Sequence, residues 1–462
     1  MNSQESRTNG DQQSAAESDG RSPTLAIGFL KSRFYRNYLL LVLLLILAFN
    51  YVDRQALGLV LQDIKHDLQL SDTQLGLLTG FAFALFYSFM GIPIARWADR
   101  GNRVNIIALT TILWSGIVAL SGVAATFTQL LLIRIGAGVG ESGCVPPAHS
   151  LISDYFDRAE RPRALAIYML GGPLSVIFGY FGAGWINQIA GWRPMFVVLA
   201  LPGLLVAVAA YFTLTEPRRN RRELLPGATR IKHVYSDRAS IGAVCKTLWR
   251  IRTFRHLVFA FAVIFFLNYG IAQWVPAFFI RTHGLQTGEL GTWLAIIFGF
   301  SGLLGIYGGG EFAARYAANN ERLQLRCLAL LFASLVLIRP FIYLVPSYRL
   351  AFLLMFPTSL AIFVGDGPLF ALIQSLVPKH MRAIAIAIVY LFGNLIGMGL
   401  GPLAAGALSD AFRPWAGEES LRYALVALCP GYLWAFWHLW RASQTVKQDL
   451  EDVGVDGIPS TS

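Results

Sequence analysis

Long apolar runs alternate with short polar connections along almost the whole chain. Windows of about 20 apolar residues have the length of a helix that crosses a bilayer. Such windows are expected at residues 37–60, 73–95, 104–125, 127–152, 162–187, 193–214, 254–280, 288–313, 323–344, 350–376, 381–408 and 420–441. Six lie on each side of one long polar stretch. The pattern therefore predicts an all-α membrane protein with twelve transmembrane helices in two six-helix bundles.

The polar stretches complete the domain organisation. The bundles are expected at residues 31–214 and 253–442, joined by an arginine-rich central loop at 215–252. Residues 1–30 and 443–462 lack an apolar core and are expected to be disordered tails, the first without a cleavable signal peptide.

The net charge of +11 follows the predicted topology rather than a nucleic-acid surface. Connections on the N-terminal side carry 27 Lys and Arg residues, whereas the opposite side carries seven. Those seven are Lys65, Arg193, Arg281, Arg339, Arg349, Arg413 and Arg422. By the positive-inside rule, both termini and the central loop are expected in the cytoplasm, with the chain in the inner (cytoplasmic) membrane. No nucleic-acid partner is expected, and the basic connections are suited to anionic lipid.

Four charged residues fall inside predicted spans. Asp53 and Arg54 lie in the first span, and Arg134 and Glu141 lie seven residues apart in the fourth. Seven residues are about two helical turns, so Arg134 and Glu141 occupy nearly the same face. Ionisable groups at membrane depth are costly, usually face a bundle interior or an aqueous cavity, and mark function.

These four residues suggest proton coupling, with two alternatives. Burial favours a protonated, neutral carboxyl group, and a nearby arginine favours the ionised form. We therefore expect Asp53 and Glu141 to take up and release protons as Arg54 and Arg134 move. The arginines are also natural partners for an anionic head group. The remaining alternative is a static ion-pair network that fixes helix packing.

The two halves of the chain repeat. Glu141 and Asp366 each precede a similar segment, with Ser150 and Ser375 nine residues further on. The first and seventh spans share Asn-Tyr, but the Asp-Arg that follows in the first half is Ile-Ala in the second. Parallel repeats with a site between them near the midplane are typical of alternating-access transporters.

Several motifs resemble the major facilitator superfamily over all twelve spans. The connection after the second span keeps Asp99, Arg100 and Arg103 of the pattern G-x-x-x-D-R-x-G-R-R, and the fourth span keeps R-x-x-x-G-x-G from Arg134. The combination of N-Y-x-D-R at residues 50–54 with G-x-G-E-x-x-x-x-P in the fourth span resembles the Spinster family.

The Spinster resemblance implies a substrate class and a gate. It implies an amphipathic, anionic lipid-like substrate of the lysophospholipid or sphingosine-phosphate type, moved by alternating access, and a monomer in the bilayer. Within the superfamily pattern, Asp99 would lie against the start of the eleventh span in the outward-facing state, with Arg100 and Arg103 completing a cytoplasmic latch.

The cavity is expected between the halves. Candidate lining residues are Asn50, Tyr51, Asn268, Tyr269, Gln273, Trp274, Asp366, Tyr390 and Asn394. The candidates other than Asp366 are uncharged. A charged first half facing an aromatic and amide-lined second half suits an amphipathic molecule. Each aromatic taken singly also fits plain core or lipid contact, and Asp366 fits a structural role equally well.

Other classes of function have weaker support. His149 and Asp154 have the H-x-x-x-x-D spacing of a lipid acyltransferase, but no soluble domain is present to hold an acyl donor, and the chain is not expected to be an enzyme. A sensor on the transporter fold would need an output domain. The main rival is proton symport of a small organic anion such as a sugar acid, which requires polar groups in both halves. The four scattered cysteines predict neither a metal site nor disulfides, and no cofactor is expected.

Overall fold

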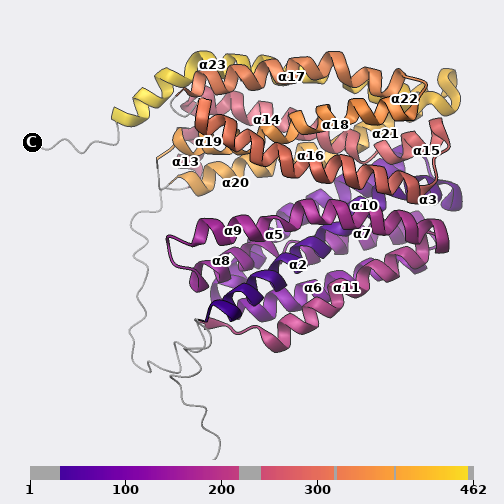
Figure 1. Cartoon of the computed structure of the whole chain (residues 1–462), viewed down its shortest axis with the longest axis horizontal. Helices are drawn as coiled ribbons and strands as arrows, with labels where there is room; N and C mark the ends of the chain where they lie inside the picture. Colours follow the sequence, from indigo (N-terminus) through magenta and orange to yellow (C-terminus); the bar gives the residue numbers. More distant parts are fainter. Residues whose placement is uncertain (1–31, 218–240, 317–319, 379–380, 456–462) are drawn as a thin grey trace, which may run out of the picture.

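The computed structural model describes residues 32–217, 241–316, 320–378 and 381–455, and it leaves the side chain of Asp366 undescribed. Its secondary structure over these ranges is helical. Two layers of helices are visible, α2 to α11 in one and α13 to α23 in the other (Figure 1).

The first bundle contains α2 (Arg33–Leu59), α3 (Leu61–Leu68), α4 (Asp72–Gly76), the π-helical turn η1 (Leu77–Phe81), α5 (Ala82–Arg100), α6 (Arg103–Leu120), η2 (Ser121–Val123), α7 (Phe127–Glu141), α8 (Val145–Tyr155), α9 (Arg161–Met169), α10 (Gly171–Ala190) and α11 (Trp192–Thr213). The second part of the chain contains α13 (Ile241–Arg250), α14 (Arg252–Ala272), α15 (Val275–His283), α16 (Thr287–Tyr316), α17 (Glu321–Leu344), α18 (Tyr348–Val364), α19 (Asp366–Ser375), α20 (Arg382–Phe392), the π-helical segment η3 (Gly393–Leu400), α21 (Gly401–Ala416), η4 (Gly417–Glu419), α22 (Ser420–Leu428) and α23 (Gly431–Val455).

These helices make twelve membrane crossings, as the sequence predicts. Ten helical segments of the described chain are long and apolar enough to cross a membrane. One of them, Ile384–Asp452, has 69 residues and holds two crossings, which meet at η4. The fourth crossing is divided between α7 and α8, so neither part is long enough alone.

The division of the fourth crossing has a local cause. Gly138 and Gly140 precede the end of α7, and Pro146 and Pro147 open α8. Proline lacks the amide hydrogen that a helix interior needs but is tolerated in a first turn. The prolines therefore begin a new helix after Ser142 to Cys144, rather than bending a continuous one.

The bundles have two ends, named here after a helix at each. The α13 end holds α8, α9 and α13, and the α3 end holds α3, α15 and α22 (Figure 1). The bundles meet along α10 and α16, and also where α4 and η1 pack against α21 and η3. Gly80 of η1 packs directly against the backbone of Gly399 in η3. The close contacts between the bundles thus gather towards the α3 end.

The helices α13 and α23 depart from the expected loop and tail. Helix α13 lies within the predicted central loop, with Val244 and Leu248 buried. Helix α23 continues to Val455, past the predicted boundary at residue 442. Asp449 accepts a hydrogen bond of 2.7 Å from the backbone N–H of Thr253, at the start of α14. The helix therefore extends past the predicted boundary as part of the second bundle, because Asp449 binds the start of α14.

Candidate functional site

The four charges predicted inside the first bundle come together as two crossed ion pairs. Helix α2 supplies Asp53 and Arg54, and α7 supplies Arg134 and Glu141. The guanidinium of Arg54 binds the Glu141 carboxylate, and that of Arg134 binds Asp53 at 2.6 Å. Each pair thus joins α2 to α7.

Aromatic rings contact both arginines. The Arg54 guanidinium carbon lies 4.7 Å from the centroid of the Phe83 ring, and that of Arg134 lies 4.9 Å from it. Arg54 also lies 4.6 Å from the Tyr51 ring. The face of an aromatic ring attracts a cation. These contacts keep both guanidinium groups in place without cancelling their charge.

The arginines face a cavity, and the carboxylates lie behind them. Arg54 and Arg134 both line a cavity of about 300 Å³ between the bundles. The side chains of Asp53 and Glu141 are 1% and 0% exposed. Asp53 Oδ1 and Glu141 Oε2 are buried oxygens with no hydrogen-bond partner in the described part of the chain. An anion in the cavity would therefore meet the arginines first.

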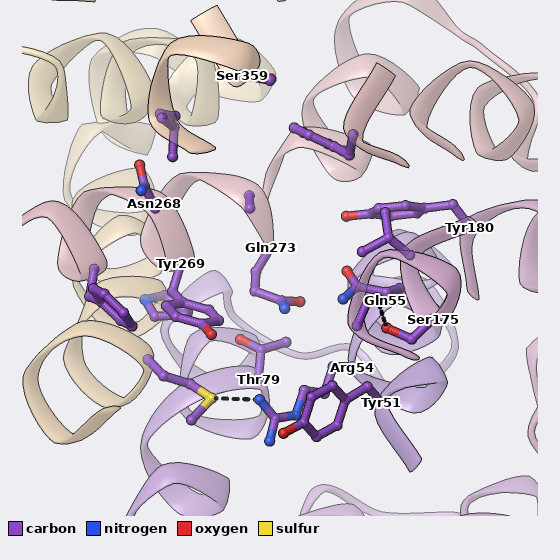
Figure 2. A pocket seen from close by; sticks show the side chains of 18 of the residues that line it. Tyr51, Arg54, Gln55, Thr79, Ser175, Tyr180, Asn268, Tyr269, Gln273 and Ser359 are labelled. Carbon is purple, nitrogen blue, oxygen red and sulfur yellow. Dashed lines mark hydrogen bonds between the residues drawn. The ribbon is translucent and has the colours of Figure 1, made fainter. Parts of the chain in front are cut away.

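The second bundle completes the wall of this cavity. Figure 2 shows Arg54 and Tyr51 on one side and Asn268, Tyr269 and Gln273 on the other. Arg54 Nη1 also reaches the sulfur of Met398 in η3, at 3.5 Å. The apolar part of the second-bundle lining consists of Phe265, Ala272, Phe298, Ile362, Phe363, Met398 and Pro402.

The predicted cavity residues divide into two groups. Tyr51, Asn268, Tyr269 and Gln273 are among the residues that line the cavity. The residues Asn50, Trp274, Tyr390 and Asn394 are not among its lining residues in this conformation. Trp274 is fully buried, and its indole N–H donates to the carbonyl of Pro402 at 2.9 Å. Tyr390 is stacked on Phe370, and the side chain of Asp366 lies outside what the structure describes.

Arg339 was assigned by the sequence analysis to a connection, and this assignment is wrong. Arg339 lies inside α17, is 5% exposed and lines the cavity. The expectation that the second bundle lines the cavity without a charged residue other than Asp366 is wrong for the same reason. Its position inside a predicted apolar span was the available signal, the same signal that identified Asp53 and Arg54.

A second ionic cluster closes the α3 end. Asp72 of α4 accepts two hydrogen bonds of 2.7 Å from Arg281 of α15, one to each carboxylate oxygen. Lys65 and Ser409 bind the same carboxylate at 2.5 and 2.6 Å. Asp410 of α21 in turn accepts the backbone N–H groups of Asp72 and Thr73 at 3.1 and 2.7 Å. This cluster joins the two bundles, and no sequence motif indicated it.

The predicted latch residues lie at the α13 end and differ in their burial. Asp99 and Arg100 are exposed, whereas Arg103 is fully buried. The Arg103 side chain binds Glu216, lies 2.7 Å from Asp154 and donates to the Ser150 carbonyl at 2.9 Å. Arg103 therefore ties the start of α6 to α8 and to the segment after α11, within one bundle.

His149 and Asp154, the two residues with the acyltransferase spacing, contact different side chains. The Asp154 carboxylate binds Arg103, and the His149 ring packs edge-on against Tyr168 at 5.5 Å. His149 thus makes a ring contact and Asp154 an ion pair, each with a different residue.

Comparisons with known proteins agree with this architecture. The sequence profile of the Major Facilitator Superfamily matches residues 43–402. An MFS-type efflux pump of Mycolicibacterium smegmatis is 32% identical over 413 residues, which cover 88% of this chain and 93% of the pump. A hexuronate transporter of Bacillus subtilis is 25% identical over 393 residues, covering 83% of this chain and 91% of that protein.

A solved structure is also similar. It is a bacterial homolog of the human lysosomal transporter Spinster, in an inward-facing and unoccupied conformation. It has a TM-score of 0.80 and 29% identity, and the match covers 90% of this chain and 99% of that one. The predicted resemblance to the Spinster family is confirmed.

Proposed function

This chain belongs to the major facilitator superfamily, and from that premise we propose that it is a proton-coupled secondary transporter of an amphipathic organic anion of the lysophospholipid or sphingosine-phosphate type. The observation that carries the proposal is a cavity lined by Arg54 and Arg134 from the first bundle and by Arg339 among aromatic and aliphatic side chains from the second. An anionic head group would lie by the arginines, and an apolar tail along Phe298, Ile362 and Phe363.

A second candidate is a small organic acid, such as a sugar acid. Asn268, Gln273, Arg339 and Ser359 add polar groups to the second-bundle wall, which such a substrate needs on both sides. The cavity volume of about 300 Å³ is at the small end of the range for ligand pockets and suits a small acid that is enclosed completely. The similarity to a hexuronate transporter agrees with this candidate.

Proton coupling follows from the crossed pairs. An anion that draws Arg54 or Arg134 towards the cavity leaves Glu141 or Asp53 as a buried charge with less compensation. A proton on that carboxyl group removes the cost of the buried charge. Substrate and proton binding would thereby be linked through the two arginines.

The conformation supports an inward-facing assignment. The ionic cluster of Asp72 closes the α3 end, and the basic connections of the sequence favour a cytoplasmic α13 end. The similar Spinster homolog is inward-facing. In the outward-facing state, Asp99 and Arg100 would close the α13 end. The proposal also includes that the protein acts as a monomer in the inner membrane.

Transport in proteoliposomes tests the function. Labelled lysophosphatidate and labelled glucuronate are offered to the purified chain, each with and without an imposed pH gradient. Gradient-driven movement of the lysolipid supports the main proposal, and movement of glucuronate alone selects the second candidate. Transport of neither anion would contradict both.

A further inference from the structure

Arg339 differs from the other two cavity arginines in its surroundings. Arg54 and Arg134 each bind a carboxylate, so these four groups of the first bundle sum to no net charge when ionised. Arg339 has no carboxylate partner among the side chains that the structure describes. The guanidinium group stays charged in proteins. Arg339 therefore gives the cavity wall an uncompensated positive charge.

The backbone position of Asp366, at the start of α19, lies far from Arg339 along the bundle. Arg339 lies five residues before the end of α17 at the α3 end, about 8 Å along the helix. Helix α18 begins at that end and runs for 17 residues, about 25 Å, before Asp366. The two backbone positions are therefore much farther apart along the bundle than the partners of an ion pair can be.

The groups around Arg339 orient it rather than neutralise it. Arg339 Nη1 donates to the hydroxyl of Tyr432, which donates in turn to Asn268 Oδ1 at 3.0 Å. The guanidinium carbon lies 5.4 Å from the Tyr432 ring. Arg339 Nε is buried and has no hydrogen-bond partner among the described residues. A fixed, buried guanidinium with an unused donor beside a cavity is suited to a carboxylate or phosphate.

We propose that Arg339, oriented by Tyr432 and Asn268, is the residue of the second bundle that binds the anionic group of the substrate. This inference rests on the proposed function and refines it. The substrate's acid group lies towards the second bundle, while Arg54 and Arg134 respond to the charge from across the cavity. Arg339 could bind either the phosphate of a lipid head group or the carboxylate of a small acid. The binding experiment therefore needs probes that distinguish these two anions.

Binding to the purified full chain in detergent tests the proposal. The first pair of probes is lysophosphatidate and the monoacylglycerol with the same chain, and the second is glucuronate and glucose. Each pair differs in the acid group, so the affinity ratio within a pair measures recognition of the anion. The pair for which the parent shows a high ratio identifies the source of the anion.

The variants are Arg339→Met, Arg339→Lys and a control, Arg322→Gln. Methionine fills a similar volume without charge, and Arg322 lies exposed on the same helix. We expect Arg339→Met to weaken anion binding by about tenfold or more and to abolish the preference over the neutral probe. Arg339→Lys should retain part of the preference, and Arg322→Gln should match the parent.

The outcomes separate this inference from the function beneath it. A parent that binds neither anion overturns the proposed function, and the role of Arg339 with it. A parent that prefers an anion, together with an Arg339→Met chain that keeps the same preference, overturns the role of Arg339 alone. Because removing an uncompensated buried charge should not harm folding, failure of both Arg339 variants to fold would show a structural arginine and also overturn the inference.

Discussion

Arg281 and Asp72, from opposite bundles, meet through two parallel hydrogen bonds of 2.7 Å. Their side chains are 5% and 2% exposed, so the pair is shielded from water. Removing one partner of a buried ion pair costs about 3–5 kcal/mol when the other charge is left uncompensated, and less than this for Arg281 because Lys65 still binds Asp72. This cost applies only to the conformation in which the α3 end is closed.

The first prediction is therefore a population shift. Arg281→Gln should favour the state open at the α3 end, since about 1.4 kcal/mol changes an equilibrium tenfold. Spin labels on cysteines at Gln69 and Glu418, both exposed at this end, measure the distance between the bundles. Arg349→Gln, exposed on α18, is the control. An unchanged distance distribution in Arg281→Gln would show that the pair does not hold the closed state.

The second prediction concerns the crossed pairs. Arg54→Gln and Glu141→Gln should each lower the melting temperature, and the double variant should recover much of the loss because no isolated charge remains. Arg134→Gln combined with Glu141→Gln should show no such recovery, since these residues belong to different pairs. Equal recovery in both double variants would contradict the crossed arrangement.

The third prediction concerns coupling. Asp53→Asn and Glu141→Gln remove the proton sites but keep hydrogen-bonding side chains of the same shape. Gradient-driven accumulation of substrate should fall by about tenfold or more, whereas exchange of labelled for unlabelled substrate at equal pH should persist. Loss of exchange together with accumulation would instead point to a binding or packing role for these carboxylates.

The fourth prediction concerns the contact between α10 and α16. Gly184 and Gly291 face each other, and a methyl group on Gly291 would overlap the carbonyl of Tyr180. Gly291→Ala should push the bundles apart and lower both thermal stability and transport. Gly310→Ala, on the same helix with open space around it, should leave both unchanged. Matching behaviour of the two variants would mean that close packing at Gly291 is not required.

The sequence predicted those structural features that can be recognised from residues close together in the chain. Apolar runs gave the twelve crossings, and ionisable residues in them identified the Asp53 and Glu141 network. The ionic cluster around Asp72 was not predicted because Asp410 lies 338 residues away from Asp72, and no local sequence pattern connects the two residues. Arg339 was misplaced because it lies close to the end of its helix, where arginines are usual. Trp274 was expected in the cavity because composition cannot tell which face of a helix turns inward.

The bond between Asp449 and Thr253 has a consequence for synthesis of the chain. The first N–H groups of a helix need a partner from outside it. Thr253 begins the second bundle, but its partner lies 196 residues further on. At about 5–20 residues per second, the ribosome makes that stretch in roughly 10–40 s. Helix α14 is therefore synthesised before this partner exists, and the bond that joins its start to α23 forms only after Asp449 has left the ribosome.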